Sequence, residues 1–219
     1  MTTPLQPPNA ERIKAACAQF DKAHELADKS LAELFHQYPQ NSDPRHVLLK
    51  VAAIDSLYHT CVFALDEVAR HIANNIEGID GALAAGSPEI VGRIAHVVIQ
   101  GRKYNFLSFA TKYCHWHNPY AYPIYDSRVD HYLCALQQQT PFTAFHHAEL
   151  LDYPRFCEIM IAFRDFHGLG SFTFREIDKF FLFHGAPPAN PISDENPSNL
   201  GAFDFFPGNE PLDLPPPPR

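Results

Sequence analysis

An aspartate after a short proline-bounded stretch is the first candidate for chemistry in this sequence. Asp126 directly follows Pro123-Ile124-Tyr125, and the residues behind it repeat at helical spacing as Val129, Tyr132, Leu133 and Leu136. Aspartate is a preferred N-cap residue because its carboxylate accepts hydrogen bonds from free amides of the first helical turn. The spacing therefore predicts that Asp126 caps a helix, with its carboxylate held in a fixed position.

A hydroxyl and an amine lie one helical turn apart in the segment before this aspartate. Ser108 and Lys112 are four residues apart, which places them on one face of an aromatic-rich helix. That helix must end at Asn118-Pro119, because the residue before a proline avoids the α region. Lys112 is open to two interpretations, a solvated helix lysine or an amine nucleophile.

Cysteine and histidine on the same helix raise the question of a metal site. Cys114 and His117 share one face, but a zinc site needs further ligands, and HEXXH or paired CxxC spacing is missing. The GxSxG, Walker A and dinucleotide glycine motifs are also missing. The sequence therefore predicts no metal and no cofactor.

The segment Ser108–Leu133 resembles the central segment of the helix-hairpin-helix DNA glycosylase superfamily, the adenine, endonuclease-III-like and 8-oxoguanine enzymes. In that family a hairpin opens a helix, and a Pro-hydrophobic-x-Asp stretch places an essential aspartate at the next helix start. Pro123–Asp126 is similar to that stretch. The resemblance implies an all-α, glycosylase-like fold and cleavage of the N-glycosidic bond of a damaged or modified DNA base, as in base excision repair.

The resemblance also assigns roles to individual residues. Asp126 would be the catalytic carboxylate, stabilising the positive charge that develops on the sugar. Ser108 falls where lyase members carry a nucleophilic lysine, and Lys112 would be the alternative amine. A flipped base needs a pocket, for which the candidates are Asp55, Tyr58, Tyr104, Trp116, Tyr122 and Tyr125. The candidate contacts to DNA phosphate are Arg102, Lys103 and Arg128.

The family's glycine-rich hairpin signature is not present in this chain. The corresponding positions read Tyr104-Asn105-Phe106-Leu107, whereas glycines would let backbone amides approach a DNA phosphate closely. The net charge of −8 also opposes phosphate binding, which depends on clustered Lys and Arg. These features favour a second interpretation, a glycosylase-shaped binding or regulatory module without catalytic activity.

Composition indicates one helical domain over residues 9–185. An apolar content of 46% with 18 Phe and 9 Tyr supplies a substantial core. No run of 18 apolar residues is present, which predicts no membrane span. The N-terminus lacks the apolar segment of a secretory signal, so a cytoplasmic location is expected. The five dispersed cysteines are expected to be reduced.

Helical periodicity predicts a compact bundle of about nine helices and no strand. The main predicted helices run from Asn9 to before Pro39, from Pro44 to about Asn74, from Ser87 to Gly101, over Phe142–Leu151, over Pro154–His167 and from the Thr173–Glu176 capping box to Gly185.

Both ends of the chain are predicted to lie outside this domain. Residues 1–8 form a short disordered lead. Residues 186–219 contain ten prolines and carry a net charge of −4, a composition typical of disorder. Within that tail, Leu200–Phe206 is an apolar and acidic cluster that could dock on a protein partner.

Overall fold

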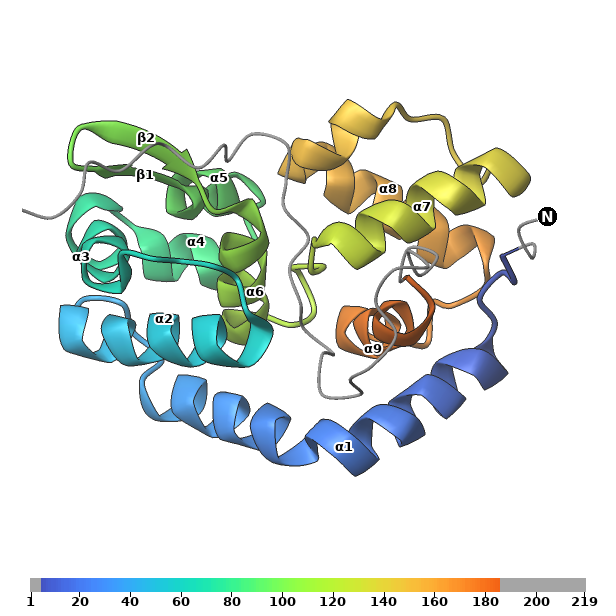
Figure 1. Cartoon of the computed structure of the whole chain (residues 1–219), viewed down its shortest axis with the longest axis horizontal. Helices are drawn as coiled ribbons and strands as arrows, with labels where there is room; N and C mark the ends of the chain where they lie inside the picture. Colours follow the sequence, from blue (N-terminus) through green and yellow to red (C-terminus); the bar gives the residue numbers. More distant parts are fainter. Residues whose placement is uncertain (1–4, 186–219) are drawn as a thin grey trace, which may run out of the picture.

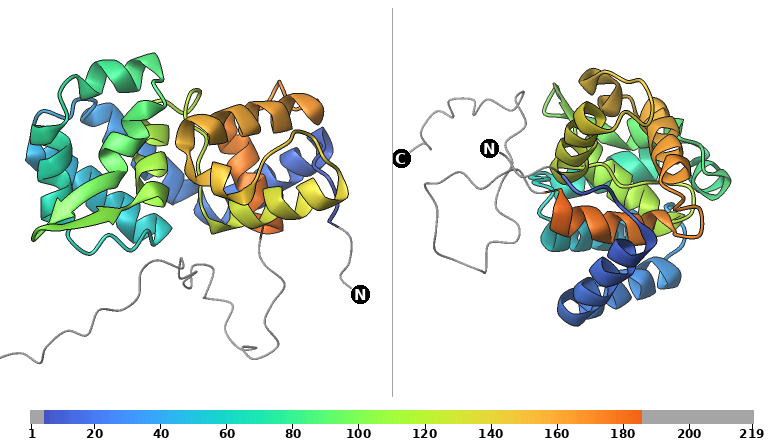
Figure 2. Two further views of the ribbon diagram at one scale, coloured as in Figure 1. Left: turned by 90° about the horizontal axis from the view of Figure 1, so that it is seen from above. Right: turned by 90° about the vertical axis from the view of Figure 1, so that its right-hand side faces the viewer.

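The computed structural model describes residues 5–185, which form nine α-helices, one 3-10 helix and one two-stranded sheet. Two groups of helices lie side by side (Figures 1 and 2). The elements are α1 (Ala10–Gln37), α2 (Pro44–Tyr58), α3 (Leu65–Asn75), α4 (Ile79–Ala85), α5 (Glu89–Ala95), β1 (His96–Ile99), β2 (Arg102–Asn105), α6 (Leu107–His117), α7 (Ser127–Gln139), η1 (His147–Leu151), α8 (Tyr153–Phe166) and α9 (Phe174–His184). The mainly helical prediction is confirmed for these residues.

The long helix α1 joins the two groups. It curves beneath both of them in Figure 1, with α2–α6 above its C-terminal half and α9 above its N-terminal half. Asn9 caps its start by accepting a hydrogen bond from the Arg12 amide (2.9 Å). Near its other end, Phe35 packs edge-on against Tyr113 of α6 at a centroid distance of 5.6 Å. One continuous helix therefore packs against both groups.

A buried lysine fixes the connection between α1 and α2. Lys50 is fully buried, and its ammonium donates hydrogen bonds to Asn41 Oδ1 (2.6 Å), the Tyr38 carbonyl (3.1 Å) and the Gln40 carbonyl (3.2 Å). Its Nζ also lies 3.2 Å from His117 Nε2 at the end of α6. Burial lowers the pKa of Lys50 to about 7.

The predicted single helix from Pro44 to about Asn74 is wrong, because two helices occupy this range. α2 ends where His59 adopts a left-handed conformation (φ 51°), and α3 begins only at Leu65. The carboxylate of Asp55 accepts hydrogen bonds from the Thr60 hydroxyl (2.8 Å) and the Val62 amide (2.9 Å), which stabilises the turn. Apolar periodicity did not reveal this turn because both helices present apolar faces to the same core.

The predicted absence of strands is also wrong. The helix that was expected to continue to Gly101 stops at Ala95, and residues 96–105 form an antiparallel hairpin instead. Val97 and Ile99 are buried while His96 and Val98 are exposed, which is the two-residue period of a strand. Gln100 and Gly101 both have positive φ, as a two-residue hairpin turn requires.

Other helix ends agree with the local sequence signals. The Thr173–Glu176 capping box opens α9, and Gly185 is its C-cap. The predicted helix over Phe142–Leu151 is reduced to η1, five residues long.

Over residues 5–185, no helix combines the length and the apolar character that crossing a bilayer requires. The predicted tail and its Leu200–Phe206 cluster lie outside the described residues.

Candidate functional site

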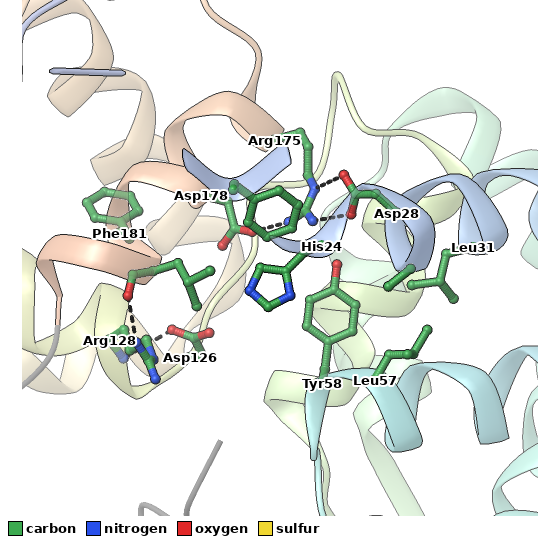
Figure 3. A pocket seen from close by; sticks show the side chains of 13 residues that line it. His24, Asp28, Leu31, Leu57, Tyr58, Asp126, Arg128, Arg175, Asp178 and Phe181 are labelled. Atoms are coloured by element: carbon green, nitrogen blue, oxygen red, sulfur yellow. Dashed lines mark hydrogen bonds and ion pairs between the residues drawn. The ribbon is translucent and has the colours of Figure 1, made fainter. Parts of the chain in front are cut away.

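A small cavity lies where α1, α2, α7 and α9 meet, and Asp126 is part of its wall (Figure 3). Its volume is about 120 Å³, close to the roughly 150 Å³ of a cavity that holds one benzene ring. The lining residues are Phe20, His24, Ala27, Asp28, Leu31, Leu57, Tyr58, Asp126, Arg128, Arg175, Asp178, Phe181 and Leu182. The lining therefore combines five charged side chains with aromatic and aliphatic ones.

The predicted capping role of Asp126 is confirmed. One carboxylate oxygen, Oδ1, accepts hydrogen bonds from the amides of Arg128 and Val129, each at 3.1 Å. The other oxygen, Oδ2, lies 3.6 Å from the Lys112 ammonium. The side chain is 28% exposed, so the carboxylate is held by the protein yet reachable from the cavity.

Lys112 lies behind Asp126 rather than in the cavity wall. Its side chain is only 3% exposed, and its ammonium donates a hydrogen bond to the Ser108 hydroxyl at 2.7 Å. The same ammonium lies 5.5 Å from the centroid of the Tyr58 ring. Ser108, Lys112 and Asp126, the three predicted catalytic residues, thus lie together, and Lys112 supplies the positive charge that balances the carboxylate.

Another part of the cavity wall is an ion-pair cluster that the sequence did not reveal. Arg175 on α9 donates hydrogen bonds to Asp28 on α1 and to Asp178 one turn further along α9. Burial raises the pKa of Asp178; the charge of Arg175 opposes that shift, and the charge of Asp126 adds to it. We call Asp28, Arg175 and Asp178 the α1–α9 clasp.

Aromatic rings surround the guanidinium of this clasp. Its central carbon lies 4.9 Å from the centroid of Phe20, 5.6 Å from that of Trp116 and 5.9 Å from that of Tyr58. Trp116 also donates a hydrogen bond to the Tyr58 hydroxyl at 3.2 Å. Burial raises the pKa of Tyr58, so the phenol is neutral. Figure 3 shows Tyr58 and His24 projecting into the space beside Asp126.

Several predicted residues take part in structure outside this cavity. Asp55 ties the turn between α2 and α3, and Tyr104 stacks against Phe106 in the hairpin region. Tyr122 and Tyr125 are 0% and 1% exposed, so their rings belong to the core. Of the predicted substrate-binding residues, Tyr58 lines the cavity and Trp116 supports it from behind.

The predicted phosphate contacts are not brought together. Arg102 and Lys103 are exposed on β2, at the outer end of the α2–α6 group and away from α7 and α9 in Figure 1. Arg128 lines the cavity, but its guanidinium donates a hydrogen bond to the Leu182 carbonyl at 2.6 Å. The three cations therefore do not form one groove around Asp126.

A metal-ligating geometry is found outside the cavity, between the first two turns of α7 and the start of η1. Within the described residues, Asp130, Cys134 and His147 have ligand atoms that all lie within 4.8 Å of one another. Cys114 and His117, the pair for which the sequence did not favour zinc, do not belong to this cluster.

Comparison with known proteins places the first part of the chain in a family. A protein of Haemophilus influenzae described as an uncharacterized protein is 40% identical over 121 residues, which cover 55% of this chain and 60% of that protein. This chain thus spans less than two thirds of the relative's length. No solved structure matches the chain.

Residues 12–121 match the family model HI_0787_N, N-terminal domain. The matched segment holds Asp28, Tyr58 and Lys112 but ends before Asp126 and α9. Since the match covers half of the sequence, the chain belongs to the HI_0787_N, N-terminal domain family, and its cavity lies where the family segment meets α7 and α9.

Proposed function

We propose that this protein is a divergent DNA N-glycosylase that uses Asp126 to cleave the bond between sugar and base in a flipped, damaged nucleotide. The observation that carries the proposal is the position of Asp126, fixed at the start of α7 and forming part of a cavity wall between two helical groups. The likeness of Pro123–Asp126 to the glycosylase motif supports the same assignment.

The chemistry needs a fixed negative charge close to the sugar. As the glycosidic bond breaks, positive charge develops on the sugar, and a carboxylate already in place stabilises it without reorganisation. Two backbone amides and Lys112 hold Asp126 in its position. The accessible part of the carboxylate would orient a water molecule that attacks the sugar.

The base would enter the space beside His24 and Tyr58. These rings offer faces for stacking, and the volume of about 120 Å³ accommodates one ring. A nucleotide with its sugar needs more room than this, so substrate entry would widen the cavity.

The arrangement favours base removal without strand cleavage. Schiff-base chemistry requires an accessible, nucleophilic amine, but Lys112 is 3% exposed and engaged with both Ser108 and Asp126. Ser108 has no amine to offer. We therefore expect an abasic product and no borohydride-trapped adduct between protein and DNA.

The test is incubation of the protein with DNA duplexes that carry a panel of damaged or modified bases, followed by alkaline cleavage of abasic sites. Wild type should release at least one base, and Asp126→Asn should reduce the rate by about 10²–10³-fold, typical of losing one electrostatic contact. Asp43→Asn is the matched control, because Asp43 also caps a helix but lies outside the cavity. If the wild type releases no base, or if Asp126→Asn releases bases at an unchanged rate, the proposed glycosylase activity of Asp126 is refuted.

A binding or regulatory module is the second candidate. It is favoured because Arg102 and Lys103 lie on β2 and do not line the cavity, and because the net charge is −8. In that case fluorescence anisotropy should detect binding of a DNA or protein ligand without any product, and Asp126→Asn should bind as tightly as wild type.

A further inference from the structure

We propose that Asp130, Cys134 and His147 form a binding site for a divalent transition-metal ion, with Zn²⁺ as the best match. This site lies outside the cavity and does not depend on the proposed glycosylase activity. Asp130 and Cys134 are one turn apart on α7, and His147 is the first residue of η1. Two elements therefore contribute ligands of three different chemical types.

The ligand atoms are already close to one another. His147 Nε2 lies 3.0 Å from each carboxylate oxygen of Asp130, and Cys134 Sγ lies 4.0 Å from Asp130 Oδ1. In a tetrahedral zinc site with bonds of roughly 2.0–2.3 Å, neighbouring ligand atoms are about 3.3–3.6 Å apart. Small side-chain movements would bring all three onto one ion.

The combination of ligands selects the metal. Thiolate, imidazole and carboxylate together suit Zn²⁺, whereas Mg²⁺ and Ca²⁺ prefer oxygen ligands alone. Three protein ligands leave a fourth tetrahedral position for a water molecule. The His147 side chain is 66% exposed, so an ion can reach the site directly from solvent.

The surroundings hold the ligands in place. The Tyr125 hydroxyl donates a hydrogen bond to Asp130 Oδ2 at 2.7 Å, the type of outer contact that orients a ligating carboxylate. Glu149 accepts a hydrogen bond from the His146 amide at 2.6 Å, and Arg155 pairs with Glu149 at 2.9 Å. These contacts fix the start of η1 and with it the backbone of His147.

A simpler role exists for part of this cluster, because an ion pair between His147 and Asp130 would also fasten η1 to α7. That role does not involve Cys134. The thiol is therefore the residue that distinguishes a metal site from a structural ion pair.

The test is titration of metal-free full-length protein with Co²⁺, whose thiolate charge-transfer and tetrahedral d–d bands report Cys134 as a ligand, and with Zn²⁺ by calorimetry. We expect one ion per chain. Cys134→Ser should abolish the thiolate band. His147→Ala should weaken Zn²⁺ binding beyond the roughly 10–100-fold effect of losing an outer contact.

Two matched variants control for adventitious binding by the other cysteines and histidines. Cys61 is exposed at the turn between α2 and α3, and His131 is exposed on α7 beside Asp130. Cys61→Ser and His131→Ala should bind the ion like wild type, with circular dichroism confirming that all variants are folded. The proposal is overturned if wild type shows no saturable binding, or if the thiolate band survives Cys134→Ser and disappears in Cys61→Ser.

Discussion

Asp126 combines two contacts that can be separated by substitution. Its Oδ1 caps α7, and its Oδ2 faces the buried ammonium of Lys112. Asparagine caps a helix as well as aspartate does, so Asp126→Asn preserves the first contact and removes only the charge. In that variant the Lys112 side chain is 3% exposed and its ammonium has lost its counter-charge.

We therefore predict that Asp126 and Lys112 are energetically coupled. Asp126→Asn and Lys112→Met should each destabilise the protein, and the double variant should lose less than the two losses added together, because removing both charges leaves neither unpaired. We expect a coupling energy of about 0.5–3 kcal/mol from urea unfolding of the four proteins. Additivity within about 0.5 kcal/mol would show that the pair contributes nothing to stability.

At this scale the sequence revealed the contacts that are local in the chain. The cap at Asp126 and the pair Ser108 and Lys112 follow from helix spacing alone. The partners in the α1–α9 clasp could not be found in this way, since Asp28 and Arg175 are 147 positions apart.

Among the elements, the hairpin of β1 and β2 departs most from expectation. Four-residue strands give too short an alternation to compete with a helical pattern that runs into them. The better signal was the Gln100-Gly101 pair after three β-branched residues, which is typical of a tight hairpin turn. Helices with strong caps, such as α1 and α9, were predicted within a few residues of their ends.

The turn of this hairpin should be sensitive to the loss of its glycine. Gly101 has φ +78°, a conformation that costs an L-residue roughly 1–2 kcal/mol, and an added Cβ would meet no atom within 4 Å. Gly101→Ala should thus lower the melting temperature by a few degrees through backbone strain alone. Gly170→Ala is the control, because its surroundings are equally open and its φ is not in the strained range. Equal melting temperatures for both variants would contradict the assigned turn.

For the whole molecule, Arg175 is the point where four helices from the two groups meet. Its partners and neighbours come from α1 (Asp28), α2 (Tyr58), α6 (Trp116) and α9 itself (Asp178). The guanidinium side chain is 14% exposed, as is that of Asp178. Removing the cation would leave Asp28 with Lys179, whose Nζ lies 3.5 Å from Asp28 Oδ2, but would take the ion-pair partner from the poorly hydrated Asp178 carboxylate close to Asp126.

We predict that Arg175→Met destabilises the protein at pH 7 by about 3–5 kcal/mol, typical of breaking a buried pair, and that part of this loss is recovered at pH 5. Burial already raises the pKa of Asp178 in the wild type, and removing the Arg175 charge that opposes this shift raises it further. The folded state then binds more protons than the unfolded state, so the free energy of unfolding rises as the pH falls.

Urea unfolding of wild type and variant at pH 7, 6 and 5 measures this difference. Arg155→Met is the control, since Arg155 pairs with Glu149 and Glu158 in a more exposed position and surface pairs contribute only about 0–1 kcal/mol. A destabilisation by Arg175→Met that does not change with pH would mean that its packing against the rings matters more than its charge.

The continuity of α1 limits how the cavity can widen. Asp28 and Leu31 of this helix form one side of the cavity, while its two halves are packed into different helical groups. Swinging the groups apart about the connector before α7 would therefore bend an unbroken helix and strain it along its length. Moving α9 relative to α1 would leave that helix unchanged, at the cost of the ion pairs that join Asp28 to Arg175 and Lys179.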